Sequence, residues 1–443
     1  MNEIPFHSKT WMKYQKRLRR EARINYYLRR LPWLGIYGIA IFALLASTFF
    51  SVYWIFTRLG KAPGQEIRNR HQPPTRPWSK KDLVLFLKGM NLDLTKEPDP
   101  LPVTKNGRRF LVETSIDPSL QAYMEKLLRR SLTLQAAAVV LRPKTGQILA
   151  MAQYPGKEGG NGENLCLKAE FPAASLFKIV SAAAAIETRG FSPETTLSYR
   201  GRRYTLYKSQ LKRREGRYSN KVTFERAFSK SINPVFGKIG IYELGRDVLA
   251  DYANRFLFNL EIPFEFPLEE SRVKIPEDDF GLAEIASGFN KKTLISPLHA
   301  ALLAAIVANG GTVMEPWVIR WVRDDQQHLL YHAAVRKIAR VIEASTARRM
   351  KSLMAETVKT GTCRKAFLPL TRKKKFKGLE LGAKTGTIND RNDRFKYDWL
   401  SAYAVSANGN DGICVAVLAV HGKKLGIRAK DLGREIIRHY FTS

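Results

Sequence analysis

Three short polar segments constrain this chain most, because a fold that uses them must bring them together. In chain order they are Ser175-Leu176-Phe177-Lys178, Ser231-Ile232-Asn233 and Lys384-Thr385-Gly386-Thr387. Each alone occurs by chance in basic proteins, but the ordered set is typical of a serine acyl-transfer site that uses a lysine as its base. We therefore expect one domain in which residues 175 to 387 surround a single site.

The first segment predicts a nucleophile and a base on one helix. Pro172 precedes a run of good helix formers, residues 175–188, and Gly190 is expected to end that helix. Ser175 then lies in the first turn, where its N–H lacks an intrahelical partner and is free to bind an oxyanion. Lys178 lies three residues on, on the same face. The spacing predicts Ser175 as nucleophile and Lys178 as base.

A lysine acts as a base only when its pKa is lowered. At a pKa near 10.4, about 1 lysine in 2,500 is neutral at pH 7, a handicap of about 4 to 5 kcal/mol. Burial and a second cation lower the pKa, and Lys384 is the candidate cation. Ser231 is placed to bridge the two lysines and relay a proton to the leaving amine, and Asn233 to donate to the substrate's amide carbonyl.

The letters K-T-G-T occur twice, and the preceding residues distinguish the copies. Apolar residues at helical spacing precede Lys359, which predicts a position in the last turn of a helix that Gly361 ends. Apolar residues alternate with others before Lys384, which predicts a strand. A strand edge suits this chemistry because a peptide substrate can pair with it. The segment Thr385, Gly386 and Thr387 is then expected to bind substrate, with Gly386 allowing close approach and the Thr387 N–H completing the oxyanion hole.

With these motifs and their flanks, the chain resembles the transpeptidase domain of the penicillin-binding proteins over about residues 113–440. The flanking stretches that carry the resemblance are residues 114–118, 139–154, 231–236, 296–298 and 308–311. Two stretches depart from the family pattern. Pro172-Ala173-Ala174 stands where a Pro-Gly pair is common, and Gly288-Phe289-Asn290 stands where a Gly-Gln-Gly type of loop is usual.

The resemblance implies a peptidoglycan D,D-transpeptidase. In that reaction Ser175 attacks the D-Ala-D-Ala peptide of a stem peptide, forms an acyl-enzyme and transfers the acyl group to an amine to cross-link the cell wall. It also implies covalent binding of β-lactams and the possibility of a membrane glycosyltransferase partner. A D,D-carboxypeptidase, a β-lactamase and a non-catalytic β-lactam sensor or scaffold are the alternatives. The chain lacks a Glu-x-x-Leu-Asn segment after Ser231 and a Tyr-Gly-Asn triplet, which disfavours two types of β-lactamase.

The expected fold class is α/β (α+β), a five-stranded, mostly antiparallel sheet flanked by helices, as in this family. Alternating apolar residues and turn signals predict the strands 135–141, 147–151, 379–386, 400–406 and 413–420. Helices are predicted at 224–229, 298–308 and 432–440.

Residues 31–57 carry no charge, and aromatic residues stand near both ends of the segment. About 20 apolar residues span a bilayer, so we expect a transmembrane helix; the segment is long for a cleaved signal peptide. The expected order is a basic cytoplasmic tail (1–30), the transmembrane helix (31–57), a connector with a helix capped by Ser79 and a hairpin at Asn106-Gly107 (58–112), and the transpeptidase domain (113–443). The resemblance implies a single pass through the bacterial inner membrane with the catalytic domain outside. The connector is too short for a glycosyltransferase or a large pedestal module.

The net charge of +34 calls for an anionic partner. Its densest part is residues 200–217, a basic stretch interleaved with Tyr204 and Tyr207. Nucleic acid conflicts with a site outside the membrane, so anionic lipid or acidic wall polymer fits better, and a solvated loop is the alternative. We expect this stretch to lie apart from the acyl-transfer site.

The sequence predicts neither a cofactor nor a metal. The cysteines, Cys166, Cys363 and Cys414, are odd in number and lack ligand spacing. Cys414 lies in an apolar strand pattern, which predicts a packed thiol. His328 and His332 stand four residues apart without a carboxylate motif and are expected at the surface.

Overall fold

The computed structural model describes residues 76–90, 100–156, 163–213, 219–390, 392–409 and 411–442. The tail and the apolar segment 31–57 lie outside these ranges, as do residues 58–75 and 91–99 of the connector. Within the described ranges, no helix is both long enough and apolar enough to cross a membrane. The described residues belong to one compact unit, Thr75–Ser443.

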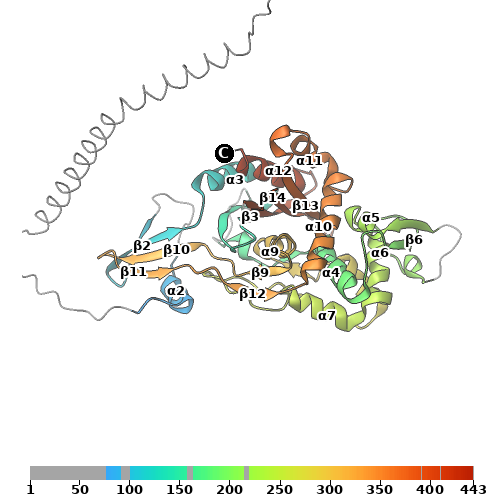
Figure 1. Ribbon diagram of the computed structural model, residues 1–443, viewed down its shortest axis with the longest axis horizontal. Helices are drawn as coiled ribbons and strands as arrows, with labels where there is room; N and C mark the ends of the chain where they lie inside the picture. Colours follow the sequence, from blue (N-terminus) through green and yellow to red (C-terminus); the bar gives the residue numbers. More distant parts are fainter. Residues whose placement is uncertain are drawn as a thin grey trace, which may run out of the picture. The chain divides into compact units, whose positions relative to one another are not determined.

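A five-stranded sheet forms the centre of this unit, as predicted (Figure 1). Its strands are, in spatial order, β13 (Leu379–Asn389), β14 (Lys396–Ser406), β15 (Gly412–His421), β3 (Gln135–Leu141) and β4 (Ile148–Tyr154). Each neighbouring pair is antiparallel. Strand β13, which carries Lys384, is therefore an edge strand, because it pairs only with β14 in this order.

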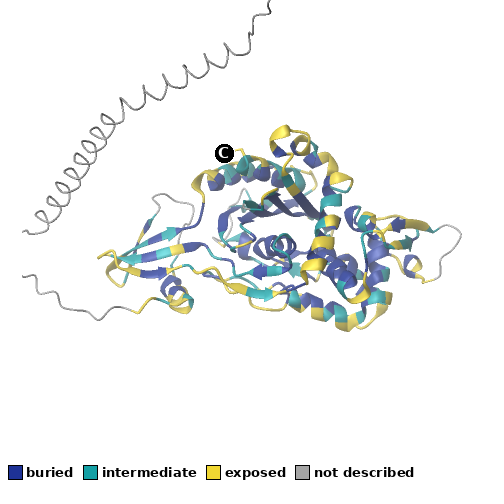
Figure 2. Ribbon diagram, viewed as in Figure 1, coloured by how far each residue is buried: buried dark blue, intermediate teal, exposed yellow. Residues whose placement is uncertain are grey.

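Apolar side chains on both faces of the sheet explain why helices cover both. One face packs against α3 (Pro118–Arg129) and α12 (Ala429–Tyr440), with α11 (Arg364–Thr371) beside α12. The other face packs against α9 (Pro297–Ala308). Helix α9 is apolar all round because it is buried all round, as Figure 2 shows. Helix α10 (Ala344–Lys359) lies along β13.

Most of the remaining helices pack against one another in a group next to α10. They are α4 (Lys178–Arg189), α5 (Phe224–Ser229), α6 (Asn233–Lys238), the π-helical turn η4 (Ile239–Leu244), α7 (Gly245–Arg255) and α8 (Asp279–Ser287). Two predictions are confirmed here. Gly190 ends α4 and has a left-handed φ of 68°, and the predicted helix 224–229 is α5.

A second sheet includes the connector hairpin. Its order is β1 (Leu101–Lys105), β2 (Arg108–Thr114), β10 (Ile319–Asp324) and β11 (Leu329–His332). Asn106 and Gly107 make the predicted turn, both with positive φ. Ser79 caps α2 (Lys80–Leu87), as predicted.

The smaller elements are β5 (Phe171–Pro172), β6 (Thr196–Tyr199), β7 (Asn220–Thr223), β8 (Leu294–Ile295), β9 (Thr312–Met314), β12 (Lys337–Arg340), η1 (Leu165–Leu167), η2 (Ala174–Phe177), η3 (Lys208–Leu211) and η5 (Lys374–Phe376).

Candidate active site

Ser175 and Lys178 come together at the start of α4. The predicted helix begins three residues late: Ser175 lies in the 3₁₀ turn η2, and α4 starts at Lys178. The reason is backbone geometry, since Ala174 has a φ of 48°, in the left-handed region, where an α-helix cannot continue. Lys178 Nζ is 2.9 Å from Ser175 Oγ. The predicted nucleophile and the predicted base thus meet through a tight turn rather than along one helix face.

The ammonium of Lys178 has three partners, all polar and uncharged. Its Nζ contacts Ser175 Oγ, Asn233 Oδ1 at 2.8 Å and the carbonyl oxygen of Ser287. A neutral amine has two N–H donors and one lone pair. If Asn233 and Ser287 accept the two N–H groups, the lone pair is left for the hydroxyl proton of Ser175. This arrangement suits a base.

Burial supplies the pKa shift that the chemistry requires. Lys178 is fully buried, and this burial, with the positive charge of Lys384 as a second cause, lowers the pKa of Lys178 well below its ordinary value. Lys384 is also fully buried, and burial lowers its pKa to about 7, although the Cys363 thiol acts in the opposite direction. Burial therefore favours the neutral form of both lysines.

The second segment contacts one lysine with each of its polar residues. Lys384 Nζ donates to Ser231 Oγ at 3.0 Å, whereas Asn233 accepts from Lys178. Ser231 has a φ of 56°, a conformation that a serine adopts only when its surroundings impose it. Ser231 thus contacts Lys384 while Asn233 contacts Lys178, so Ser231 does not form the predicted bridge between the two lysines. The ring of Phe228 lies 5.5 Å from Lys384 Nζ.

The basic stretch touches this site, contrary to expectation. The backbone N–H of Asn233 donates to the carbonyl of Arg203 at 2.7 Å, and its Nδ2 donates to the carbonyl of Tyr204 at 3.1 Å. The expectation that the basic stretch lies apart from the site is therefore wrong at Arg203 and Tyr204. Nothing in the sequence indicated these contacts with Asn233, because backbone carbonyls make them. The second N–H of the Asn233 amide is left for a ligand.

The third segment lies along the nucleophile. Lys384 and Gly386 point to the face of β13 opposite that of Leu381 and Ala383, as the strand period requires. A Cβ on Gly386 would lie 3.4 Å from Ser175 N, so the backbones of the two segments approach closely.

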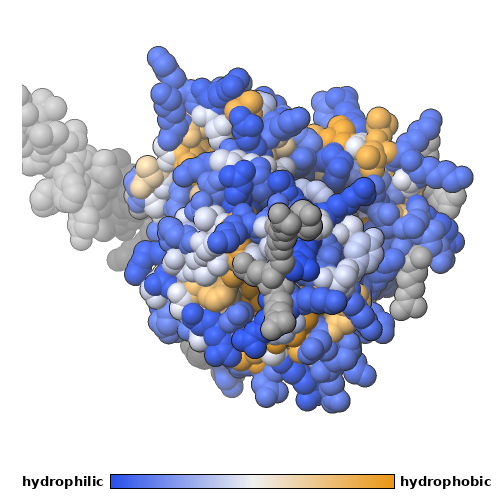
Figure 3. Space-filling view, turned by 90° about the vertical axis from the view of Figure 1, so that its right-hand side faces the viewer, coloured by the Kyte–Doolittle hydropathy of each residue, from blue (hydrophilic) through white to orange (hydrophobic). Residues whose placement is uncertain are grey.

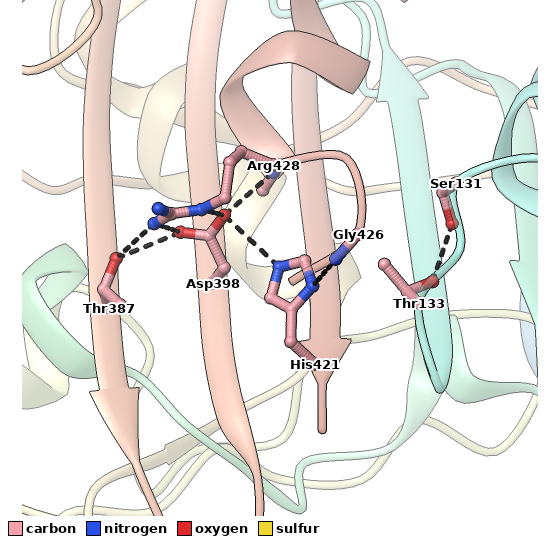
Figure 4. A network of polar contacts seen from close by, with 8 residues as sticks. Ser131, Thr133, Thr387, Asp398, His421, Gly426 and Arg428 are labelled. Carbon is pink, nitrogen blue, oxygen red and sulfur yellow. Dashed lines mark hydrogen bonds and ion pairs between the residues drawn. The ribbon is translucent and has the colours of Figure 1, made fainter. Parts of the chain in front are cut away.

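A polar network centred on the buried Asp398 holds Thr387, and the sequence did not indicate it (Figure 4). Thr387 Oγ1 donates to Asp398 Oδ1 at 3.0 Å, and Arg428 binds both oxygens of Asp398 at 2.6 and 2.8 Å. Burial alone raises the pKa of Asp398, but the hydrogen bonds from Arg428, together with His421 at 3.7 Å, outweigh it and hold the pKa below its ordinary value. The only local signal was a carboxylate inside an apolar strand. The network fixes the side chain of Thr387.

The other K-T-G-T copy occupies the predicted helix end. Lys359 is the last residue of α10 and is exposed. The same loop still reaches the site, because Thr362 Oγ1 lies 2.7 Å from Thr385 Oγ1.

A pocket of about 640 Å³ opens at the far end of the third segment. Its lining includes Thr387, Ile388 and Asn389 from β13, together with Phe289 and Asn290, which are the two departures from the family loop. The preceding residue must be glycine for two reasons. Gly288 has a left-handed φ of 65°, and a Cβ there would lie 2.0 Å from the carbonyl oxygen of Ala174. Extended substrate can therefore continue past Thr387.

The cysteines are buried, and His328 lies at the surface. Cys166, Cys363 and Cys414 are free and buried. His328 is exposed and pairs with Asp324. Among the described residues, no group of three or more Cys, His, Asp or Glu side chains is arranged to hold a metal ion.

Comparisons with known proteins give consistent relatives. Residues 136–438 match the family model described as the penicillin binding protein transpeptidase domain. The peptidoglycan D,D-transpeptidase PbpA of Mycobacterium tuberculosis is 25% identical over 74% of this chain and 71% of that protein. Stage V sporulation protein D of Bacillus subtilis is 23% identical over 64% of this chain, but the match covers only 45% of that longer protein. The solved imipenem acyl-enzyme complex of penicillin-binding protein A from M. tuberculosis has a TM-score of 0.62 at 24% identity, over 75% of this chain and 79% of that one.

Proposed function

This chain belongs to the penicillin-binding protein transpeptidase family, and we propose that it is a peptidoglycan D,D-transpeptidase with Ser175 as its nucleophile. The observation that carries the proposal is the buried Lys178, whose Nζ lies 2.9 Å from Ser175 Oγ. A fully buried lysine with a lowered pKa beside a serine hydroxyl has little structural purpose. It is the arrangement that activates a nucleophile.

Acylation begins when neutral Lys178 takes the hydroxyl proton of Ser175 as the oxygen attacks the carbonyl of the penultimate D-Ala. The oxyanion that forms is stabilised by the N–H groups of Ser175 and Thr387. The C–N bond then breaks, and the departing D-Ala nitrogen receives its proton through Ser231, whose hydroxyl is hydrogen-bonded to Lys384. The product is an ester between the stem peptide and Ser175.

Deacylation uses an amine from a second stem peptide. Its nitrogen attacks the ester carbonyl and its proton passes through Ser231 back to Lys384. The Ser175 oxygen leaves with the proton that Lys178 has held since acylation. Asn233 orients the donor through its remaining amide N–H, and the edge of β13 at Thr385 and Gly386 pairs with the peptide. The pocket beyond Thr387 has space for the rest of the donor. β-Lactams enter the first half of the same cycle.

Product analysis on a donor peptide ending in D-Ala-D-Ala, with and without an amine acceptor, tests the proposal. We expect release of D-Ala and a new amide bond to the acceptor. Release of D-Ala with hydrolysis alone, at every acceptor concentration, would instead make the protein a D,D-carboxypeptidase. Absence of both would make it a non-catalytic binder.

We also propose that residues 31–57 anchor the chain in the inner membrane, with residues 1–30 cytoplasmic and the domain 113–443 outside. The absence of charge over residues 31–57 supports this topology. A membrane glycosyltransferase that makes the glycan strands is the expected partner. Protease added to intact spheroplasts should digest the domain and spare the tail; protection of the domain would refute the topology.

A further inference from the structure

Helix α2 carries a stripe of four exposed residues, Lys81, Val84, Leu85 and Lys88. Their i, i+3, i+4, i+7 spacing places them on one face of the helix. Leu85 is 65% exposed and Val84 39%, so the middle of the stripe is aliphatic and its two ends are cationic. Figure 1 shows α2 at the lower left of the described unit, and Figure 3 views the opposite end, where the surface is predominantly hydrophilic. The mechanism above does not use this helix.

The opposite face of α2 is fixed to the catalytic domain. Leu83, Phe86 and Leu87 are buried. The ring of Phe86 lies 4.9 Å from the rings of both Trp78 and Phe110. The buried side chains of α2 belong to the same hydrophobic core as the first turn of α4, at the active site. The stripe therefore has a fixed orientation relative to that site.

The charges around α2 leave the stripe positive. Lys80 is held by the domain, because its Nζ forms an ion pair with Glu315. Asp82 is the only acid of residues 76–90, and its carboxylate accepts from the N–H and the hydroxyl of Ser79 at the helix start. Within the described ranges, the two lysines of the stripe form no ion pair. An anionic surface would therefore match the stripe.

The chain that leads to α2 comes from the segment proposed to span the membrane. That segment ends at Thr57, and residues 58–75 separate it from Arg76, the first described residue. A stretch of this length spans at most about 65 Å when fully extended. The anchor therefore keeps α2, the first described element after it, within that distance of a bilayer surface.

We propose that the stripe of α2 lies on an anionic bilayer surface and fixes the orientation of the catalytic domain on the membrane. This inference rests on the proposed membrane anchor. Val84 and Leu85 enter the boundary between head groups and acyl chains, and the lysine at each end meets lipid phosphates. A protein partner fits less well, because aromatic residues dominate protein interfaces and those around α2 pack against one another in the domain.

A fluorescent probe on the stripe tests this inference in the full-length protein. The probe NBD is attached to Leu85→Cys or, as the control, to Leu260→Cys, which replaces a 44% exposed leucine outside α2. The native cysteines are buried and so leave the new thiol as the reactive one. In vesicles that contain phosphatidylglycerol, we expect lipids with a nitroxide near the head group to quench the probe at residue 85 several-fold more than the probe at residue 260.

Charge variants test the cationic ends of the stripe. Each lysine near an anionic surface is worth about a 5-fold shift between bilayer-bound and free α2. Lys81→Gln combined with Lys88→Gln should therefore remove most of the quenching at residue 85. Lys365→Gln, which changes an exposed lysine of α11, should leave the quenching as it is. Quenching that is unchanged in the double variant would contradict the role of the lysines.

The other outcomes separate this inference from the proposals before it. Equally weak lipid quenching at residues 85 and 260 would overturn it. So would a probe at residue 85 that is shielded from aqueous iodide but not quenched by the lipids, because a second copy of the chain would then cover the stripe. Release of the full-length protein from the vesicles by alkaline carbonate would refute the anchor and this inference with it. Penicillin acylation of Ser175 reports on the proposed function separately and should be the same in every variant.

Discussion

The two K-T-G-T segments have the same four letters and opposite environments. Lys384 lies on the edge strand β13, is fully buried, and donates to Ser231 Oγ at 3.0 Å. Lys359 ends the helix α10 and is exposed. The difference teaches that a short motif acquires its chemistry from the element that carries it. Burial lowers the pKa of Lys384 to about 7, which no exposed lysine would show.

The loop that carries the Lys359 copy of K-T-G-T packs against the residues around the Lys384 copy. Thr362 N donates to the carbonyl of Ser229 at 3.1 Å, and Thr362 Oγ1 lies 2.7 Å from Thr385 Oγ1. A Cβ on Gly361 would come within 2.5 Å of the Ser229 oxygen. The loop after α10 is therefore packed directly behind the second and third catalytic segments. One copy is expected to affect the reaction and the other the fold.

The largest expected effect separates the two lysines. Lys384→Ala should slow acylation by penicillin at least about 100-fold, the scale of a lost electrostatic or proton-transfer group. Lys359→Ala should stay within a few-fold, because the side chain is in solvent. Rates of acylation measured by stopped flow check both, and equal losses or the reverse order would contradict the assignment.

The pH dependence of stability should differ between the same two lysines. Between pH 7 and about 10.4 the unfolded chain holds a proton on Lys384 that the folded chain has released, so the free energy of unfolding rises with pH. The slope approaches about 1.4 kcal/mol per pH unit for this one group. Lys384→Met should therefore stabilise the protein more at pH 7 than at pH 10, whereas Lys359→Met should show no such trend. Melting temperatures across this range measure it, and parallel behaviour of the two variants would refute the burial argument.

Substituting the glycines of the two segments should affect stability and acylation differently, with Gly361 mattering mainly for stability and Gly386 mainly for acylation. Gly361→Ala forces a Cβ against the Ser229 carbonyl and should destabilise the fold by about 1 to 3 kcal/mol, as overpacking does. On Gly386 a Cβ meets Ala174 Cβ at 3.2 Å, so Gly386→Ala should cost less stability but slow acylation about 10-fold by crowding Ser175. Denaturant titrations and acylation rates of the folded protein distinguish the two. A Gly386→Ala variant that is less stable and still reacts normally would contradict this division.

The sequence predicted the parts of the site that depend on local periodicity. Alternation before Lys384 gave β13, and the helical spacing before Lys359 gave α10. The turn at Ala174 was missed because alanines favour a helix, and packing imposed the left-handed φ of 48°. The Asp398 to Arg428 pair joins residues far apart in the chain, so no local pattern reports it. The contact of Arg203 with Asn233 uses backbone atoms, which carry no sequence signal at all.

Labelling with radioactive or fluorescent penicillin tests the central claim most directly. The account predicts a covalent adduct on the Ser175 peptide of the wild type, because a β-lactam mimics the D-Ala-D-Ala amide that Ser175 attacks, and no adduct in Ser175→Ala. An adduct that persists in Ser175→Ala, at Ser231 or at any other residue, would contradict the assignment of the nucleophile and with it the proposed mechanism.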